Sequence, residues 1–154
     1  MATNISTEVR HSLRKHGWIV TGVPGKAFYT IGLLDRFDHP ELAIHGLSPE
    51  RSGGVLHAAY ASIENGNRLD QPNLVQPGVI SSKSGLSMDI MTLAVDPSNF
   101  PDWFGQALGY YQADLKMIQL LWPDREGRFP GNPDFDEKFK HQLRFDVRRP
   151  EYND

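Results

Sequence analysis

Apolar residues recur at every fourth position near the start of the chain, at Ile5, Val9 and Leu13. This spacing predicts an amphipathic helix that packs its apolar stripe on the rest of the protein. Either Ser6 or Asn4 can accept the first backbone N–H groups of this helix. We therefore expect the chain to begin with a surface helix of about three turns.

The next two apolar segments are short and rich in β-branched and aromatic residues, as strands are. They cover residues 18–23 and 28–33, and Pro24 and Gly25 lie between them. A turn at these two residues predicts a β-hairpin. Alternation along the second strand places three side chains on one face: Tyr29, Ile31 and Leu33.

The rest of the chain alternates less regularly between apolar and polar stretches. In chain order the pattern predicts a polar connection over 35–39, a strand over 42–47, a helix over 48–66, a loop over 67–78, paired strands over 79–83 and 86–95 around Ser84-Gly85, a helix over 97–111, and a strand over 117–122. The last strand is almost wholly apolar, which is typical of the centre of a sheet.

This order of elements lacks the regular alternation of strand and helix found in doubly wound folds. We expect one α+β domain over residues 1–131. Its sheet should be mixed or mostly antiparallel, with about five to six strands packed by about three helices. The polar residues 132–154 are expected to form a C-terminal tail that is partly packed on this domain.

Composition and charge narrow the class of protein. The chain has 154 residues, 39% of them apolar, which is ordinary for one globular domain. Its net charge of −3 gives no basic footprint for nucleic acid. The polar N-terminus predicts no signal peptide, and no apolar run approaches the roughly 20 residues that span a bilayer. We expect a soluble, cytoplasmic protein that binds neither nucleic acid nor membrane.

The chain has no cysteine, which excludes disulfides, thiolate zinc sites and cysteine nucleophiles. No nucleophile elbow, dinucleotide fingerprint or phosphate loop is present either. The cofactor therefore stays unknown, and we assign no metal site. A carboxylate–histidine metal site that uses Asp124 or a second histidine brought in by the fold is the less favoured alternative.

The densest group of reactive side chains follows the predicted hairpin: Asp35, Asp38, His39, Glu41 and His45. In an enzyme, His39 and Glu41 could serve as a base and its orienting group. Their His-x-Glu spacing superficially matches zinc deaminases, but that chemistry needs two cysteine ligands. The alternative is that His39 and Glu41 hydrogen-bond loop backbone at the entrance of a strand.

Two hydroxyl groups on the predicted second strand are further candidates for binding. Tyr29 and Thr30 could orient a ligand through their hydroxyl groups. Core packing and a cross-strand hydrogen bond are the more frequent roles of such residues in strands.

A second candidate site follows the predicted central strand, with Trp122, Asp124, Arg128 and Phe129. Arg128 could bind an anionic group, and Trp122 or Phe129 could stack on a planar ring. Alternatively, an ion pair between Arg128 and Asp124 braces the turn while both aromatic rings lie in the core.

Three separated motifs give the chain a family resemblance. They are residues 28–33 with His39-Pro40-Glu41-Leu42 and Gly46-Leu47, then Trp103-Phe104-Gly105-Gln106 with Tyr110-Tyr111, and finally residues 119–124 with Gly127-Arg128-Phe129-Pro130. Together they resemble the bacterial domain-of-unknown-function 4262 family over most of the chain. The sequence departs from the family at Gly131, where a tryptophan is expected, and in its charged tail. The resemblance implies no known activity.

We therefore expect a non-catalytic binding module for a small anionic or planar ligand, or for a partner protein. One alternative is a hydrolase-like enzyme that uses His39 and Glu41. Another is an interaction protein of an immunity or defence system. A homodimer is a further expectation, drawn only from how common symmetric dimers are among soluble proteins.

Overall fold

The computed structural model describes residues 5–81, 87–136, 138 and 142–149. Its elements are α1 (Thr7–His16), β1 (Ile19–Gly22), β2 (Ala27–Ile31), α2 (Leu33–Phe37), β3 (Glu41–His45), α3 (Pro49–Glu64), β4 (Val75–Ser81), β5 (Ser87–Ala94), η1 (Pro97–Asn99), α4 (Phe100–Trp103), α5 (Gly105–Tyr111), η2 (Gln112–Asp114) and β6 (Met117–Leu121).

The six strands form one sheet in the order β1-β2-β3-β6-β5-β4. Among the described strands, only β3 and β6 pair in parallel, and the other four pairings are antiparallel. The expected α+β fold with a mixed, mostly antiparallel sheet is confirmed. Strand β6 lies near the centre of the sheet with all five residues buried, as its apolar sequence predicts.

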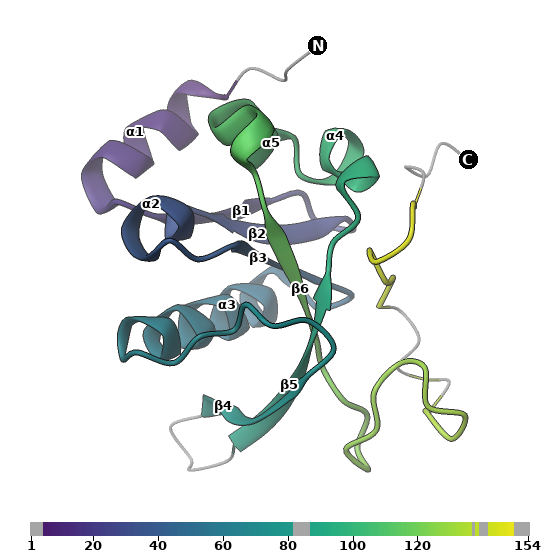
Figure 1. The fold of residues 1–154 in the computed structure, drawn as a ribbon. Helices are drawn as coiled ribbons and strands as arrows, with labels where there is room; N and C mark the ends of the chain where they lie inside the picture. The colour runs from purple at the N-terminus through teal and green to yellow at the C-terminus, as the bar shows by residue number, and fades with distance from the viewer. Residues whose placement is uncertain (1–4, 82–86, 137, 139–141, 150–154) are drawn as a thin grey trace.

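The two faces of the sheet carry separate cores (Figure 1). On one face α1, α4 and α5 pack over β1, β2 and β3, with Phe104 and Phe145 among the buried side chains. On the opposite face lies α3, whose Leu56 and Ala59 are fully buried. We call these the α5 face and the α3 face.

The first helix and the hairpin form as predicted. The Ser6 hydroxyl accepts a hydrogen bond from the Val9 N–H at 3.2 Å and so caps α1. Gly17 ends the helix in the left-handed conformation, with φ +81°. Strands β1 and β2 pair with Ile19 opposite Ile31.

The polar connection expected over residues 35–39 is wrong, because Leu33–Phe37 form the short helix α2. Gly32 precedes this helix with φ +120° and offers no side-chain cap. The chain leaves β2 at this residue, so Leu33 packs in the core of the α3 face. The expected alignment of Leu33 with Tyr29 and Ile31 on one face is therefore also wrong.

The single helix expected over residues 97–111 is broken into η1, α4 and α5. Phe104 interrupts it with φ −134° and ψ 40°, outside the helical region. This backbone accompanies a fully buried Phe104 ring, edge-on to Tyr29 at 5.3 Å between ring centroids. With α2, this break gives five α-helices in the described residues, where about three were expected.

Strand β4 begins at Val75, earlier than the expected residue 79, and therefore contains Pro77. Its pairing with β5 shifts register between Gln76 and Ile80, and Gly78 there has φ +66°. An edge strand with a bulge accommodates a proline that a regular ladder would exclude. The turn expected at Ser84-Gly85 lies outside the described residues.

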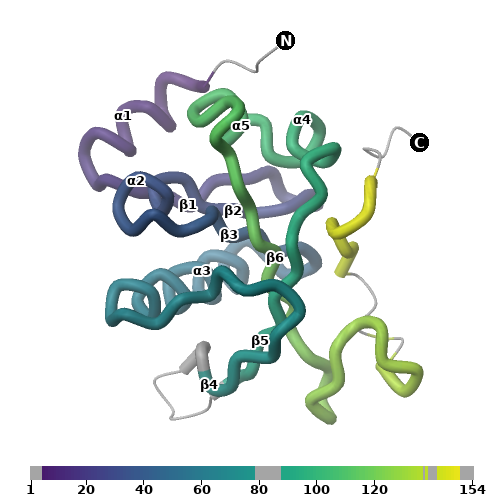
Figure 2. The backbone as a smooth tube through the Cα atoms, in the orientation of Figure 1, coloured from purple at the N-terminus to yellow at the C-terminus, as the bar shows by residue number. Residues whose placement is uncertain are grey.

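After β6 the chain runs through a loop, and its described residues 142–149 return beside the sheet toward α4 (Figure 2). Within the described part of the chain, no helix has the length and apolar character needed to cross a membrane.

Gly32 and Gly54 allow a matched test of whether backbone conformation requires glycine at a position. A Cβ at Gly32 would lie 2.5 Å from the Gly17 carbonyl oxygen and would require a strained φ, so Gly32→Ala should lower the free energy of unfolding by at least about 2 kcal/mol. Gly54→Ala lies within α3 with open space around it and should raise this free energy by about 0.5–1 kcal/mol. Urea unfolding of both variants checks the opposite signs.

Candidate functional site

Glu41 begins β3 with its side chain fully buried. The carboxylate accepts hydrogen bonds from the Thr30 hydroxyl at 2.7 Å and from the backbone N–H groups of Gly32, Leu33 and Leu34 at 3.0–3.2 Å. These N–H groups are at the start of α2, where a helix leaves its first donors without internal partners. Glu41 thus caps α2 from a neighbouring strand.

Tyr111, at the end of α5, completes this polar centre. Its hydroxyl oxygen accepts a hydrogen bond from the Gly32 N–H at 3.0 Å. Burial raises the pKa of Glu41, while hydrogen bonds from the Leu34 N–H and the Thr30 hydroxyl oppose that rise. Burial and the nearby Glu41 charge also raise the pKa of Tyr111 well above its usual value.

Thr30 and Tyr29 both lie on β2 but point to opposite faces of the sheet. The buried Thr30 hydroxyl donates to Glu41 and accepts from the Leu42 N–H at 2.9 Å. The Tyr29 oxygen accepts from the Gln106 N–H at 3.1 Å, and burial raises the pKa of this phenol. The hydroxyl groups therefore tie β2 to β3 and to α5.

His39 is buried between the end of α2 and the segment after α3. Its Nδ1 lies 2.8 Å from the Pro40 carbonyl oxygen, and its Nε2 accepts from the Leu69 N–H at 2.9 Å. These partners require a neutral ring with the proton on Nδ1. Burial lowers the pKa of His39, in agreement with that neutral state.

Asp124 organises the loop after β6. Its carboxylate accepts from the N–H groups of Glu126, Arg128 and Asp136 and pairs with the Arg128 guanidinium at 3.0 Å. Burial opposes ionisation, but the Arg128 and Asp136 N–H groups and the guanidinium outweigh it and lower the pKa of Asp124 to about 2. Arg128 and Asp124 thus brace this turn.

The aromatic residues of the same region differ in exposure. Trp122 is buried, and its Nε1 donates to the His45 carbonyl oxygen at 3.1 Å. Phe129 is half-buried beside the loop that Asp124 organises. Trp122 therefore joins the ends of β6 and β3.

The predicted site residues consequently fall into separate groups. Glu41 and Thr30 meet at the start of α2, His39 binds Leu69, and Asp124 with Arg128 holds the loop after β6. No hydrogen bond between described atoms joins His39, Glu41 and Asp124, and each has its own backbone partners. No group of three His, Asp or Glu side chains in the described chain could hold a metal ion.

A cavity of about 330 Å³ lies elsewhere, between the β1–β2 turn and the α4–α5 junction. Its lining includes Thr21, Lys26, Tyr29, Asp102, Trp103 and Gln106. Sequence reasoning placed Trp103 only in the core and overlooked Lys26. A lysine at a hairpin turn gives no signal by itself, because only the fold brings it beside an indole 77 residues away.

Lys26 lies across the Trp103 ring, with 5.5 Å between the ammonium nitrogen and the ring centroid. The ammonium also donates to the Asp102 carbonyl oxygen at 3.1 Å. The Trp103 Nε1 in turn donates to the Arg149 carbonyl oxygen, which fixes the indole plane at the cavity wall. The cavity therefore combines a cation, an aromatic face and hydroxyl and amide groups.

The family model described as Domain of unknown function (DUF4262) matches residues 12–136. The chain belongs to this family. The match includes Lys26, Trp103 and the Glu41 centre, and it ends before residues 142–149. No curated protein and no solved structure matches the chain.

Glu41→Gln should lower the free energy of unfolding by about 2–4 kcal/mol. The amide NH2 would replace an oxygen that accepts backbone N–H groups, and each buried donor left unpaired costs about 1–3 kcal/mol. Glu64→Gln at the exposed end of α3 is the control and should change stability by less than about 0.5 kcal/mol. Equal effects of the two substitutions would contradict the capping role of Glu41.

His39 should make stability depend on pH near neutrality. Its pKa is lowered from 6.5, so below about pH 6.5 the unfolded chain gains a proton that the folded chain resists. The folding equilibrium should therefore weaken as pH falls, by at most about tenfold per pH unit from this one group. Urea unfolding at pH 7.5, 6.5 and 5.5 should give a flatter pH profile for His39→Gln, whereas identical slopes would assign the effect to other groups.

Proposed function

We propose that this DUF4262 protein is a non-catalytic binding module for a small, anionic, planar ligand. The observation that carries the proposal is the Lys26 ammonium beside the Trp103 ring at the wall of a cavity. An anionic group can pair with the ammonium. A planar group can enter the cavity beside the Trp103 side chain, which is 4% exposed.

The size and lining of the cavity support this ligand class. Its volume of about 330 Å³ falls at the lower end of the range of small-molecule sites, about 300–1,000 Å³. Thr21 and Gln106 can orient a ligand by hydrogen bonds. Asp102 also lines the cavity, so the ligand's anionic group belongs on the Lys26 side.

The bonding of His39 and Glu41 favours binding over the hydrolase-like alternative. A general base needs an accessible lone pair near the substrate. Both ring nitrogens of His39 and both carboxylate oxygens of Glu41 already have backbone partners in the core. Neither residue lines the Lys26 cavity.

We further propose that the protein works in the bacterial cytoplasm. The absence of cysteine and the resemblance to a bacterial family support this location.

Benzoate, which is planar and anionic, should bind the cavity more tightly than its neutral analogue benzamide. In a titration of the ¹⁵N-labelled protein, the amide signals of Lys26 and Gln106 and the indole signal of Trp103 should shift. Because the ammonium provides the preference for an anion, Lys26→Met should weaken benzoate binding by about 5- to 10-fold and leave benzamide unchanged, which corresponds to about 1–1.4 kcal/mol.

Lys116→Met removes an exposed lysine away from the cavity and should leave both affinities unchanged. Equal benzoate binding by the wild type and Lys26→Met, or shifts confined to other parts of the chain, would rule out this site. Native mass spectrometry of the purified protein should first show whether a ligand is already bound.

A further inference from the structure

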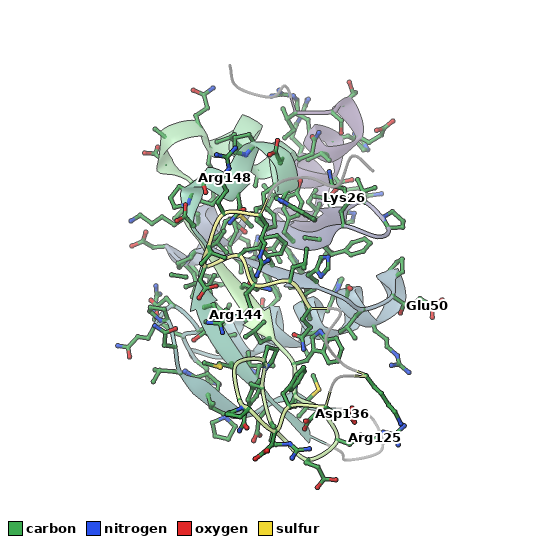
Figure 3. The ribbon with its side chains drawn as sticks, turned by 90° about the vertical axis from the view of Figure 1, so that its right-hand side faces the viewer. Lys26, Glu50, Arg125, Asp136, Arg144 and Arg148 are labelled. Atoms are coloured by element: carbon green, nitrogen blue, oxygen red, sulfur yellow. The ribbon has the colours of Figure 1, made fainter. Side chains whose placement is uncertain are left out.

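Residues 142–149, here called the strap, lie across the α5 face of the sheet without joining its ladder. Figure 3 shows the side of the molecule on which the strap lies, with Arg144 near the start of the strap and Arg148 toward α4. Three features distinguish the strap from an ordinary part of the core: how its backbone is bound, how its aromatic residue is anchored, and where it falls in the sequence.

Side chains of the domain make most of the hydrogen bonds to the strap's backbone, and the Asp96 N–H adds one backbone bond to the Phe145 carbonyl oxygen at 2.7 Å. The Gln119 amide accepts from the Phe145 N–H at 2.7 Å and donates to the Leu143 carbonyl oxygen at 2.6 Å. The His45 Nδ1 accepts from the Leu143 N–H at 3.1 Å. These contacts recognise main-chain groups and do not depend on the identity of the bound side chains.

The other end of the strap is bound in the same way. The Asn99 amide donates to the carbonyl oxygens of Phe145 and Val147, both at 2.9 Å, and accepts from the Arg149 N–H at 2.7 Å. The Trp103 Nε1 donates to the Arg149 carbonyl oxygen. Leu143, Phe145, Val147 and Arg149 thus present backbone groups to the domain. The strap is not an extended strand, because the chain turns over residues 145–147 and the Arg149 side chain donates back to the Arg144 carbonyl oxygen.

Phe145 anchors the strap and is fully buried. Its ring centroid lies 4.9 Å from that of Trp103, 5.4 Å from that of Phe104 and 5.8 Å from that of His45. Leu143 packs against the same core, whereas Val147 is 51% exposed. The buried Gln142 side chain accepts from the Trp122 N–H at 2.9 Å and donates to the Trp122 carbonyl oxygen at 2.7 Å. The recognition pattern is therefore glutamine and leucine, followed two residues after the leucine by phenylalanine.

The groove and its occupant belong to different parts of the sequence. His45, Asn99, Trp103 and Gln119 all lie within the family match, which covers residues 12–136, and the strap lies beyond it. Without the strap, the buried His45, Asn99 and Gln119 would lose hydrogen-bond partners, which is costly in a core. A peptide segment therefore has to fill the groove for these side chains to keep their hydrogen bonds.

We propose that His45, Asn99, Trp103 and Gln119 form a peptide-binding groove that the strap occupies in cis, and that a Gln-Leu-x-Phe peptide segment can replace it. The inference is independent of the ligand of the Lys26 cavity. The tether gives the strap an effective concentration in the millimolar range, so an incoming peptide competes poorly unless the anchor of the strap is weakened.

The test uses the full chain with Phe145→Ala and a fluorescent peptide of residues 142–149, Gln-Leu-Arg-Phe-Asp-Val-Arg-Arg. Fluorescence polarisation should show at least about tenfold tighter binding to the Phe145→Ala chain than to the wild type. The same peptide with alanine in place of its phenylalanine should lose at least about tenfold in affinity. Val147→Ala, which changes an exposed strap residue, should behave as the wild type does.

A folded Phe145→Ala chain that does not bind the peptide, or that binds both peptides equally, would overturn the proposal. If that variant does not fold, hydrogen exchange of the wild type decides instead. The amides of Leu143, Phe145 and Arg149 should then exchange at least about tenfold faster than those of β3 and β6, because the strap opens locally. Exchange of these three amides only at the rate of β6 would overturn the proposal.

Discussion

The structure depends on how three buried polar side chains of the central strands are hydrogen-bonded. Glu41 and His45 on β3 and Gln119 on β6 all point to the α5 face, on strands that pair in parallel. A buried polar group without a partner costs about 1–3 kcal/mol. The free energy of unfolding of a whole domain is only about 5–15 kcal/mol. Each of the three is therefore hydrogen-bonded to backbone that lies outside the sheet.

These bonds determine where the irregular segments lie. The Glu41 carboxylate accepts hydrogen bonds from the first N–H groups of α2 and so fixes the path of the chain between β2 and β3. His45 and Gln119 hold the strap through Leu143 and Phe145. The polar side chains of the central strands thus hold the loops in place through hydrogen bonds. Glu41 and His45, which are titratable, have this structural role.

The two proposed sites both lie on the α5 face. Trp103 links the two proposed sites, because its ring faces Lys26 at the cavity while its Nε1 holds the end of the strap at Arg149. The two proposed sites therefore share the Trp103 side chain.

The sequence by itself determined the elements whose signals are local. The Ser6 cap and apolar period of α1, the Pro24-Gly25 turn, and the apolar run of β6 all depend on neighbours within a few residues. Tertiary structure alone decided the rest. Helix α2 has no cap of its own and depends on Glu41, and Phe104 breaks a helix as its ring enters the core. Lys26 meets Trp103, and Gln119 meets Phe145, only after the sheet has assembled, because contacts between distant residues leave no periodic pattern in the chain.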